Sequence, residues 1–135
     1  MGQNGVRPSY LLDTVILIDH LNGVVAATKW LAALKDNEAA ISVITRAEVL
    51  VGVTREEKAP VSLLLDSFEC LPLLPDDADR VAQLRQKYRW KLPDAFQAAL
   101  ALKNNLKLVT RNTKNFSPKK HPFVLIPYRL AQSLS

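Results

Sequence analysis

Short apolar runs alternate along the chain with longer stretches in which apolar residues recur every three or four positions. Short apolar runs bounded by turn residues are typical of buried strands. We therefore expect strands at residues 10–12, 39–44, 70–74, 106–110 and 122–126. Pro72 lacks the backbone N–H that pairing on both sides requires, so the third strand is expected at an edge of the sheet.

The longer stretches have helical periodicity. They predict helices at residues 15–21, 24–34, 45–52, 60–68, 76–89 and 93–104. Residues 15–21 fit a helix or a strand by pattern, and a helix is favoured because Asp13-Thr14 suits its N-terminus. Thr45 and Glu48 have the spacing of a capping box, which predicts a helix start at Thr45. Residues 111–116 fit a loop or a short helix.

Strands separated by helices predict an α/β fold, with one parallel sheet between two layers of helices. The length of 135 residues suits one domain. We expect residues 10–135 to form this domain and residues 1–9 to be a disordered leader. In such sheets, ligands bind beyond the carboxyl ends of the strands, where the strand order reverses. This rule predicts where the functional residues should meet.

Three carboxylates stand at positions that this rule brings together. Asp13 follows the first strand, Glu48 lies one helical turn beyond the second, and Asp94 lies in the first turn of an apolar helix that Pro93 begins. Each alone also fits a structural role, as a helix cap, half of a capping box or a first-turn charge. Together they would repel one another unless a cation compensated them. Hard oxygen ligands at an open site suit Mg²⁺ or Mn²⁺.

Composition and charge narrow the classes of function. No apolar run reaches the roughly 18 residues of a membrane helix, and no signal-peptide core is visible at the start. The single cysteine, Cys70, permits no internal disulfide, so we expect a cytoplasmic protein. The net charge is +5, and residues 80–135 hold twelve Lys or Arg against one acid. This basic half indicates either a polyanion partner or a solvated basic face.

Other enzyme classes with a strand followed by Asp fit the sequence poorly. A haloacid-type phosphatase would need a second Asp where Val15 stands, and a response-regulator receiver would need an Asp after the third strand, where Leu74 stands. His20 and His121 have no metal-ligand spacing. No glycine-rich phosphate loop is present, which argues against a nucleotide-binding enzyme.

Four segments resemble, in order and spacing, the signature segments of PIN-domain ribonucleases, most of all the VapC-type toxins of toxin–antitoxin pairs. They are residues 11–14, 44–48, 92–95 and 109–116. The resemblance spans about residues 10–127. It implies a five-stranded sheet in the order 3-2-1-4-5, Mg²⁺-dependent cleavage of RNA, a homodimer and a small antitoxin that blocks the site. It implies no membrane partner.

The resemblance also assigns roles to residues. Asp13, Asp94 and Glu48 would hold the metal, and Asn112 would complete the catalytic set. Thr14, Thr110 and Asn115 would support it, and the RNA backbone would be held by Arg111, Lys114, Lys119 and Lys120. The family often has Asn or Ser at the position of Val15, and a fourth acid at the position of Asn112 or Asn115.

These departures leave three formal charges, so weaker metal binding is expected. A catalytically weak or inactive PIN-like domain that binds RNA or a protein partner is the alternative. A plain interaction domain, whose basic half serves solubility, is a third possibility.

Overall fold

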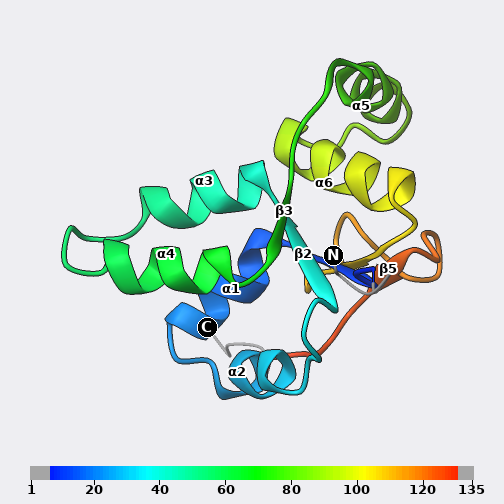
Figure 1. Ribbon diagram of the computed structural model, residues 1–135. Coiled ribbons are helices and arrows are strands. Elements are labelled where there is room, and N and C mark those ends of the chain that lie inside the picture. Colours follow the sequence, from blue (N-terminus) through cyan, green and yellow to red (C-terminus); the bar gives the residue numbers. More distant parts are fainter. Residues whose placement is uncertain (1–6, 131–135) are drawn as a thin grey trace, which may run out of the picture.

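Five parallel strands form one sheet in a computed structural model that describes residues 7–130. Their order across the sheet is β3 (Glu69–Leu71), β2 (Ala39–Ser42), β1 (Tyr10–Leu12), β4 (Lys107–Val109) and β5 (Val124–Leu125) (Figure 1). This is the order that the family resemblance implies, and Pro72 follows an edge strand as expected. Residues 1–6 of the expected leader and residues 131–135 lie outside the described part. Ser9 already forms backbone hydrogen bonds to Glu38 and Lys107.

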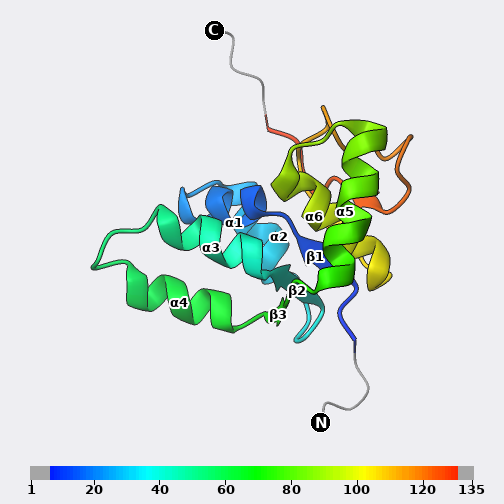
Figure 2. The same cartoon turned by 90° about the horizontal axis from the view of Figure 1, so that it is seen from above.

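Helices cover both faces of the sheet. α5 (Pro75–Tyr88) and α6 (Leu92–Lys103) lie on one face; α1 (Thr14–Leu21), α2 (Val25–Ala32), α3 (Val43–Val51) and α4 (Lys58–Asp66) lie on the other (Figure 2). The two groups of helices lie on opposite sides of the strands, which gives the three layers expected from the sequence. Among residues 7–130 no single helix is long and apolar enough to cross a membrane. The pair of α1 and α2 has the necessary length and composition together, but the two helices are bent by 113° relative to each other.

Side chains of the central strands alternate between two hydrophobic clusters. Leu11 and Leu108 face the α5–α6 side, whereas Leu12 and Val109 face the other helices, and all four are fully buried. This alternation follows from the two-residue period of a strand. It fixes the register of β1 against β4, because a slip of one residue would exchange the two faces.

One predicted helix start is wrong. The strand predicted at residues 39–44 ends at Ser42, whose hydroxyl accepts a hydrogen bond from the backbone N–H of Thr45 at 3.1 Å. The helix therefore begins at Val43. Thr45 is a buried helical residue, and Glu48 is not part of a capping box. The sequence Ser42-Val43-Ile44-Thr45 contains its own cap, so the helix begins within residues whose β-branched side chains favour a strand.

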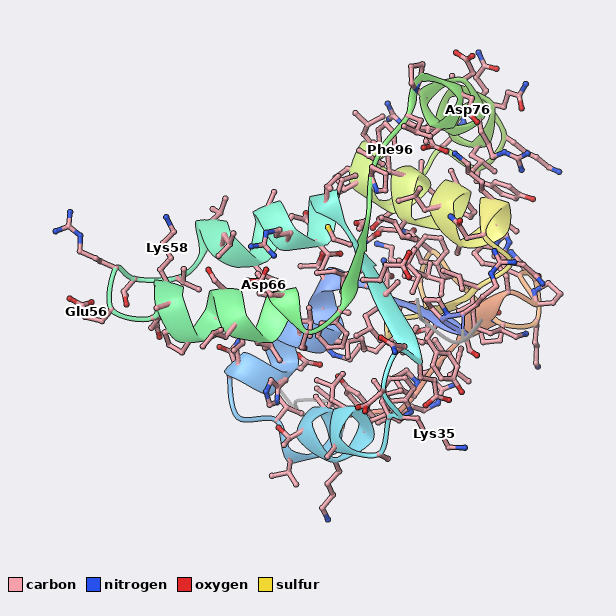
Figure 3. All side chains as sticks on the ribbon, in the orientation of Figure 1. Lys35, Glu56, Lys58, Asp66, Asp76 and Phe96 are labelled. Atoms are coloured by element: carbon pink, nitrogen blue, oxygen red, sulfur yellow. The ribbon has the colours of Figure 1, made fainter. Side chains whose placement is uncertain are left out.

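The other boundaries differ from the predicted ones by three residues at most. The strands β3, β4 and β5 are shorter than expected, α6 begins one residue before Pro93, and residues 111–116 contain turns without a helix. The outer hairpin of α3 and α4 carries exposed charges, among them Glu56, Lys58 and Asp66 (Figure 3).

A buried carboxylate ties three distant segments together on the α1 side of the sheet. Asp19 on α1 is 5% exposed and accepts two hydrogen bonds, of 2.5 and 2.8 Å, from the guanidinium of Arg111, which follows β4. The hydroxyl of Tyr128, near the end of the described chain, donates a third at 2.8 Å. The pKa of Asp19 lies below its usual value because Arg111 and Tyr128 donate to the ionised form, although burial acts in the opposite direction.

We expect Asp19→Asn to lower the free energy of unfolding by about 2 kcal/mol at pH 7, because charge-assisted hydrogen bonds are lost. Since the folded-state pKa is depressed, this stabilisation is full above the unfolded pKa near 4 and disappears as the pH falls through the folded value. Urea unfolding at pH 7 and below pH 4 measures the difference. The control is Asp66→Asn, which breaks a more exposed pair with Arg46 and should cost less than about 1 kcal/mol. Equal losses in the two variants would contradict the assignment.

Candidate functional site

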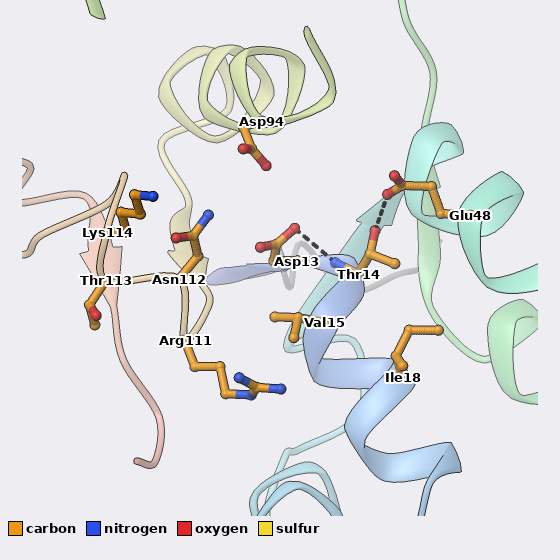
Figure 4. A pocket seen from close by; sticks show the side chains of 10 residues that line it. All are labelled: Asp13, Thr14, Val15, Ile18, Glu48, Asp94, Arg111, Asn112, Thr113 and Lys114. Atoms are coloured by element: carbon orange, nitrogen blue, oxygen red, sulfur yellow. Dashed lines mark hydrogen bonds between the residues drawn. The ribbon is translucent and has the colours of Figure 1, made fainter. Parts of the chain in front are cut away.

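A cavity of about 690 Å³ opens at the carboxyl ends of β1 and β4, where the strand order reverses. Its lining comes from α1, α3, α6 and the loop after β4 (Figure 4). The lining residues are Asp13, Thr14, Val15, Ile18, Glu48, Asp94, Arg111, Asn112, Thr113 and Lys114. All three carboxylates that the sequence singles out therefore face one cavity.

Asp13 is the most enclosed of the three acids, with 8% of its surface exposed. It is the N-cap of α1, and one carboxylate oxygen accepts from the backbone N–H of Thr14 at 2.9 Å. The same oxygen accepts from the amide of Gln97 at 3.3 Å, and the other accepts from the hydroxyl of Thr110 at 2.7 Å. Three separate segments thus hold one carboxylate in place.

Burial raises the pKa of Asp13 above its usual value, and the negative charge of Asp94 raises it further. The hydrogen bonds from Thr110, Thr14 and Gln97 favour the ionised form and oppose the shift. A nearby cation would also favour the ionised form. The cavity thus carries more negative charge than its protein environment compensates.

Asp94 lies in the first turn of α6, where the helix dipole favours a negative charge. It is partly buried and accepts a hydrogen bond from the side-chain amide of Asn115 at 3.2 Å. Burial is the main cause that raises the pKa of Asp94, and the charge of Glu48 adds to it, while Asn115 and Lys91 lower it. The charge of Asp94 thus acts on Asp13, and the charge of Glu48 acts on Asp94, across the cavity.

Glu48 reaches the cavity from α3 and is held from α1. The hydroxyl of Thr14 donates to its carboxylate at 2.6 Å (Figure 4). The hydroxyl of Thr45 lies 3.0 Å from that of Thr14 and accepts from the amide of Gln97 at 2.7 Å. A hydrogen-bonded chain therefore links α6, α3 and α1 behind the carboxylates, and Thr14 lies within it, in contact with Glu48 and Thr45.

The loop after β4 completes the cavity wall. The Thr110 hydroxyl accepts from the backbone N–H of Asn112 at 3.0 Å, and the Asn112 side-chain oxygen accepts from the N–H of Asn115 at 3.3 Å. Phe116, fully buried, anchors the end of this loop and donates its N–H to the Asn112 carbonyl. The loop thereby presents its two asparagine side chains next to Asp94.

Not every residue implied as an RNA contact lines this cavity. Arg111 and Lys114 do, although the Arg111 guanidinium is paired with Asp19. Lys120 lines a neighbouring cavity, and Lys119 is exposed outside both.

The sequence analysis missed Gln97 and Asp19. Gln97 is 1% exposed and is the only polar residue in the apolar body of its helix, three positions after Asp94, which was the available signal. Asp19 gave no signal, because its partners Arg111 and Tyr128 are more than ninety positions away.

The carboxylates of Asp13, Asp94 and Glu48 face the cavity and match the ligands of a hard divalent cation. The side chain of Asn112 also lines the cavity, while its amide oxygen accepts from the backbone N–H of Asn115 (Figure 4). As the side chains stand in residues 7–130, no three of the acidic, histidine or cysteine groups are close enough to ligate one ion. Glu48 is bonded to Thr14 instead. The donor chemistry of the lining, which offers carboxylate oxygens from three segments, is nevertheless of the kind that fits a hard cation.

Comparison with known proteins agrees with this geometry. The family model of the PIN domain matches residues 10–120. Ribonuclease VapC10 of Mycobacterium tuberculosis is 38% identical over 128 residues, covering 88% of this chain and 96% of that protein. Ribonuclease VapC19 of the same organism is 33% identical over 113 residues, covering 78% and 90%.

A solved structure supports the same placement. A toxin–antitoxin complex from Klebsiella pneumoniae contains a chain that is 40% identical, with a TM-score of 0.83, and the alignment covers 90% of this chain and all of that one. The family match over residues 10–120 includes every residue that lines the first cavity. The chain belongs to the PIN domain family and is similar to the ribonucleases of VapC type.

Proposed function

We propose that this protein is a Mg²⁺- or Mn²⁺-dependent endoribonuclease and the toxin of a toxin–antitoxin pair. The observation that carries the proposal is that Asp13, Glu48 and Asp94, from three separate segments of a PIN domain, line one cavity at the carboxyl ends of the strands. The named relatives are ribonucleases, which supports RNA as the substrate.

In this proposal, Asp13 and Asp94 hold the cation, and Glu48 joins them directly or through a water. When bound there, a divalent cation would supply a water of lowered pKa and positive charge to offset the charge that develops on a phosphodiester. Thr14 and Thr110 keep Glu48 and Asp13 oriented through the hydrogen bonds described above. Asn112 adds an oxygen without charge, and Asn115 orients Asp94. Arg111 is assigned to orienting the loop, because its guanidinium is occupied by Asp19.

The partners proposed are an RNA substrate and a small antitoxin that covers the cavity. The Klebsiella pneumoniae structure is a toxin–antitoxin complex, which supports the antitoxin. A homodimer and a cytoplasmic location remain predictions from the family resemblance and from the single cysteine, Cys70.

The alternative is a PIN domain that binds RNA or a protein without cleaving it. The neutral side chains of Asn112 and Asn115, where a fourth acid is usual in the resemblance, favour it. This alternative predicts RNA binding that is equal with and without Mg²⁺ and yields no cleaved product. A titration of Mg²⁺ against cleavage of a labelled single-stranded RNA separates the two functions.

We expect Asp94→Asn to lower kcat/KM for RNA cleavage at least about 100-fold, because one of the two inner acids is lost. The substitution preserves side-chain shape and removes repulsion, so the folding stability should not fall. The control is Asp79→Asn, which neutralises an exposed acid on α5. The assay follows cleavage in Mg²⁺ with enzymes purified identically. Equal activity of wild type and Asp94→Asn would exclude the proposed catalytic centre.

We expect Asn112→Asp to lower the Mg²⁺ concentration needed for half-maximal cleavage by about tenfold, since a fourth carboxylate strengthens the attraction for the cation. Without metal, the same variant should be less stable than wild type because the added charge repels Asp13 and Asp94. Asn37→Asp is the control, because it adds one charge at an exposed turn before β2, at the opposite end of the strands. An unchanged Mg²⁺ requirement would show that Asn112 does not contact the ion.

A further inference from the structure

A second cavity, of about 630 Å³, adjoins the one described above. The two cavities share Thr113 and Lys114 in their walls. The second is lined by Tyr88, Trp90, Thr113, Lys114, Asn115, Ser117, Lys120 and His121. Its volume is in the range of cavities that hold a small organic ligand or one nucleotide. The catalytic proposal gives no role to its aromatic residues.

One wall of the second cavity is aromatic. The rings of Tyr88 and Trp90 are stacked, with centroids 4.4 Å apart and planes 13° apart. His121 meets both rings edge-on, at 5.1 and 5.2 Å. Trp90 and His121 are buried, at 5% and 8% exposed, whereas Tyr88 is 37% exposed. Tyr88 is therefore the ring that a ligand can reach, and the buried rings fix its position.

The charge of the second cavity is opposite to that of the first. Its lining side chains are neutral or basic, with Lys114 and Lys120 as the cations. Lys87 adds a third ammonium, 5.2 Å from the centre of the Tyr88 ring, on a flexible side chain that can move aside. Burial and the charges of Lys120 and Lys87 lower the pKa of His121, so its ring is neutral at pH 7. Positive potential thus surrounds an accessible aromatic ring.

We propose that this second cavity is a subsite for a nucleotide of single-stranded RNA next to the phosphate that is cleaved. The base lies against Tyr88, and Lys114 and Lys120 hold the adjoining phosphates. Aromatic stacking and lysines along the backbone are the features by which proteins bind single strands without reading a base sequence. Lys114 belongs to both cavities, so one strand can pass from the subsite to the carboxylates.

A peptide fits this cavity less well than RNA. Its occupant has to bring negative charge to the lysines and a flat ring to Tyr88, and a nucleotide offers both. A peptide segment that spanned both cavities would need basic side chains in the first, acidic cavity and acidic side chains in the second. The inference rests on the proposed function for its choice of RNA, and its test measures binding without cleavage.

The test measures the affinity of the full-length protein for a labelled oligouridylate in EDTA, by fluorescence anisotropy. Tyr88→Ala is expected to weaken binding about tenfold, the effect of losing one base–aromatic stack. Tyr88→Phe keeps the ring and should bind within about twofold of wild type. An abasic oligomer of the same length should bind wild type and Tyr88→Ala equally. Weakening of the abasic oligomer to the same extent as oligouridylate would overturn the stacking.

Lys120→Gln tests the charge without disturbing the aromatic wall. It should weaken oligouridylate binding several-fold and reduce the slope of log affinity against log salt by about 0.7, the effect of one lost phosphate contact. Lys58→Gln is the control, because Lys58 is exposed at the start of α4 on the opposite face of the sheet (Figure 3). Unchanged RNA affinity in both Tyr88→Ala and Lys120→Gln would overturn the subsite. The subsite would also be overturned if these two variants lost affinity for a labelled oligoglutamate peptide while their RNA binding stayed unchanged.

Failure of the subsite proposal can be distinguished from failure of the nuclease proposal. If Asp94→Asn and wild type cleave RNA equally while Tyr88→Ala weakens binding, the subsite stands and the catalytic centre does not. If Asp94→Asn abolishes cleavage while the Tyr88 and Lys120 variants bind and cleave as wild type does, the subsite alone is wrong.

Discussion

The arrangement of this domain depends on the burial of one carboxylate, that of Asp13, at the end of the central strand. An ionised carboxylate enclosed by protein costs several kcal/mol unless donors surround it. Here the donors come from the start of α1, from Gln97 on α6 and from Thr110 after β4. These elements also carry or adjoin Asp94 and Asn112. The hydrogen bonds that make the buried charge tolerable therefore also fix the walls of the cavity, so fold stability and site geometry depend on the same contacts.

Charged side chains form separate negative and positive clusters around Asp13. Negative groups gather in the first cavity, while the basic second half of the chain supplies cations beside it. One of those cations is already engaged, since Arg111 forms a two-bond ion pair with Asp19. The pair anchors the loop that carries Asn112, and it links that loop to α1 and Tyr128. Lys114 and Lys120 are therefore the lysines that line the two cavities, whereas the arginine next to the acids holds the loop.

The sequence was sufficient for the strand pattern and the meeting of the three acids, because both follow from local periodicity and from the rule that parallel strands end at one edge. It was insufficient where two local patterns compete. Ser42 and Thr45 are both plausible helix caps, and in the structure Ser42 is the cap, while Thr45 lies inside the helix and accepts a hydrogen bond from Gln97. Partners far apart in the chain, such as Asp19 and Arg111, leave no periodic signal. The metal ligands proposed for this site likewise rest on the family resemblance and on the fold together.

Asn112 and Asn115, being neutral, affect both the attraction of the acidic cavity for a cation and the repulsion among its carboxylates. A carboxylate at Asn112 or Asn115 would add attraction for a cation, but it would also add repulsion while no cation is bound. The amide of Asn115 instead donates to Asp94, and this hydrogen bond lowers the pKa of that acid against the effects of burial and of Glu48. A carboxylate could not make this contact in its ionised form. The loop therefore keeps Asp94 closer to its charged state. In the proposed metal site, the negative charge that attracts a cation would come from Asp13, Asp94 and Glu48 alone.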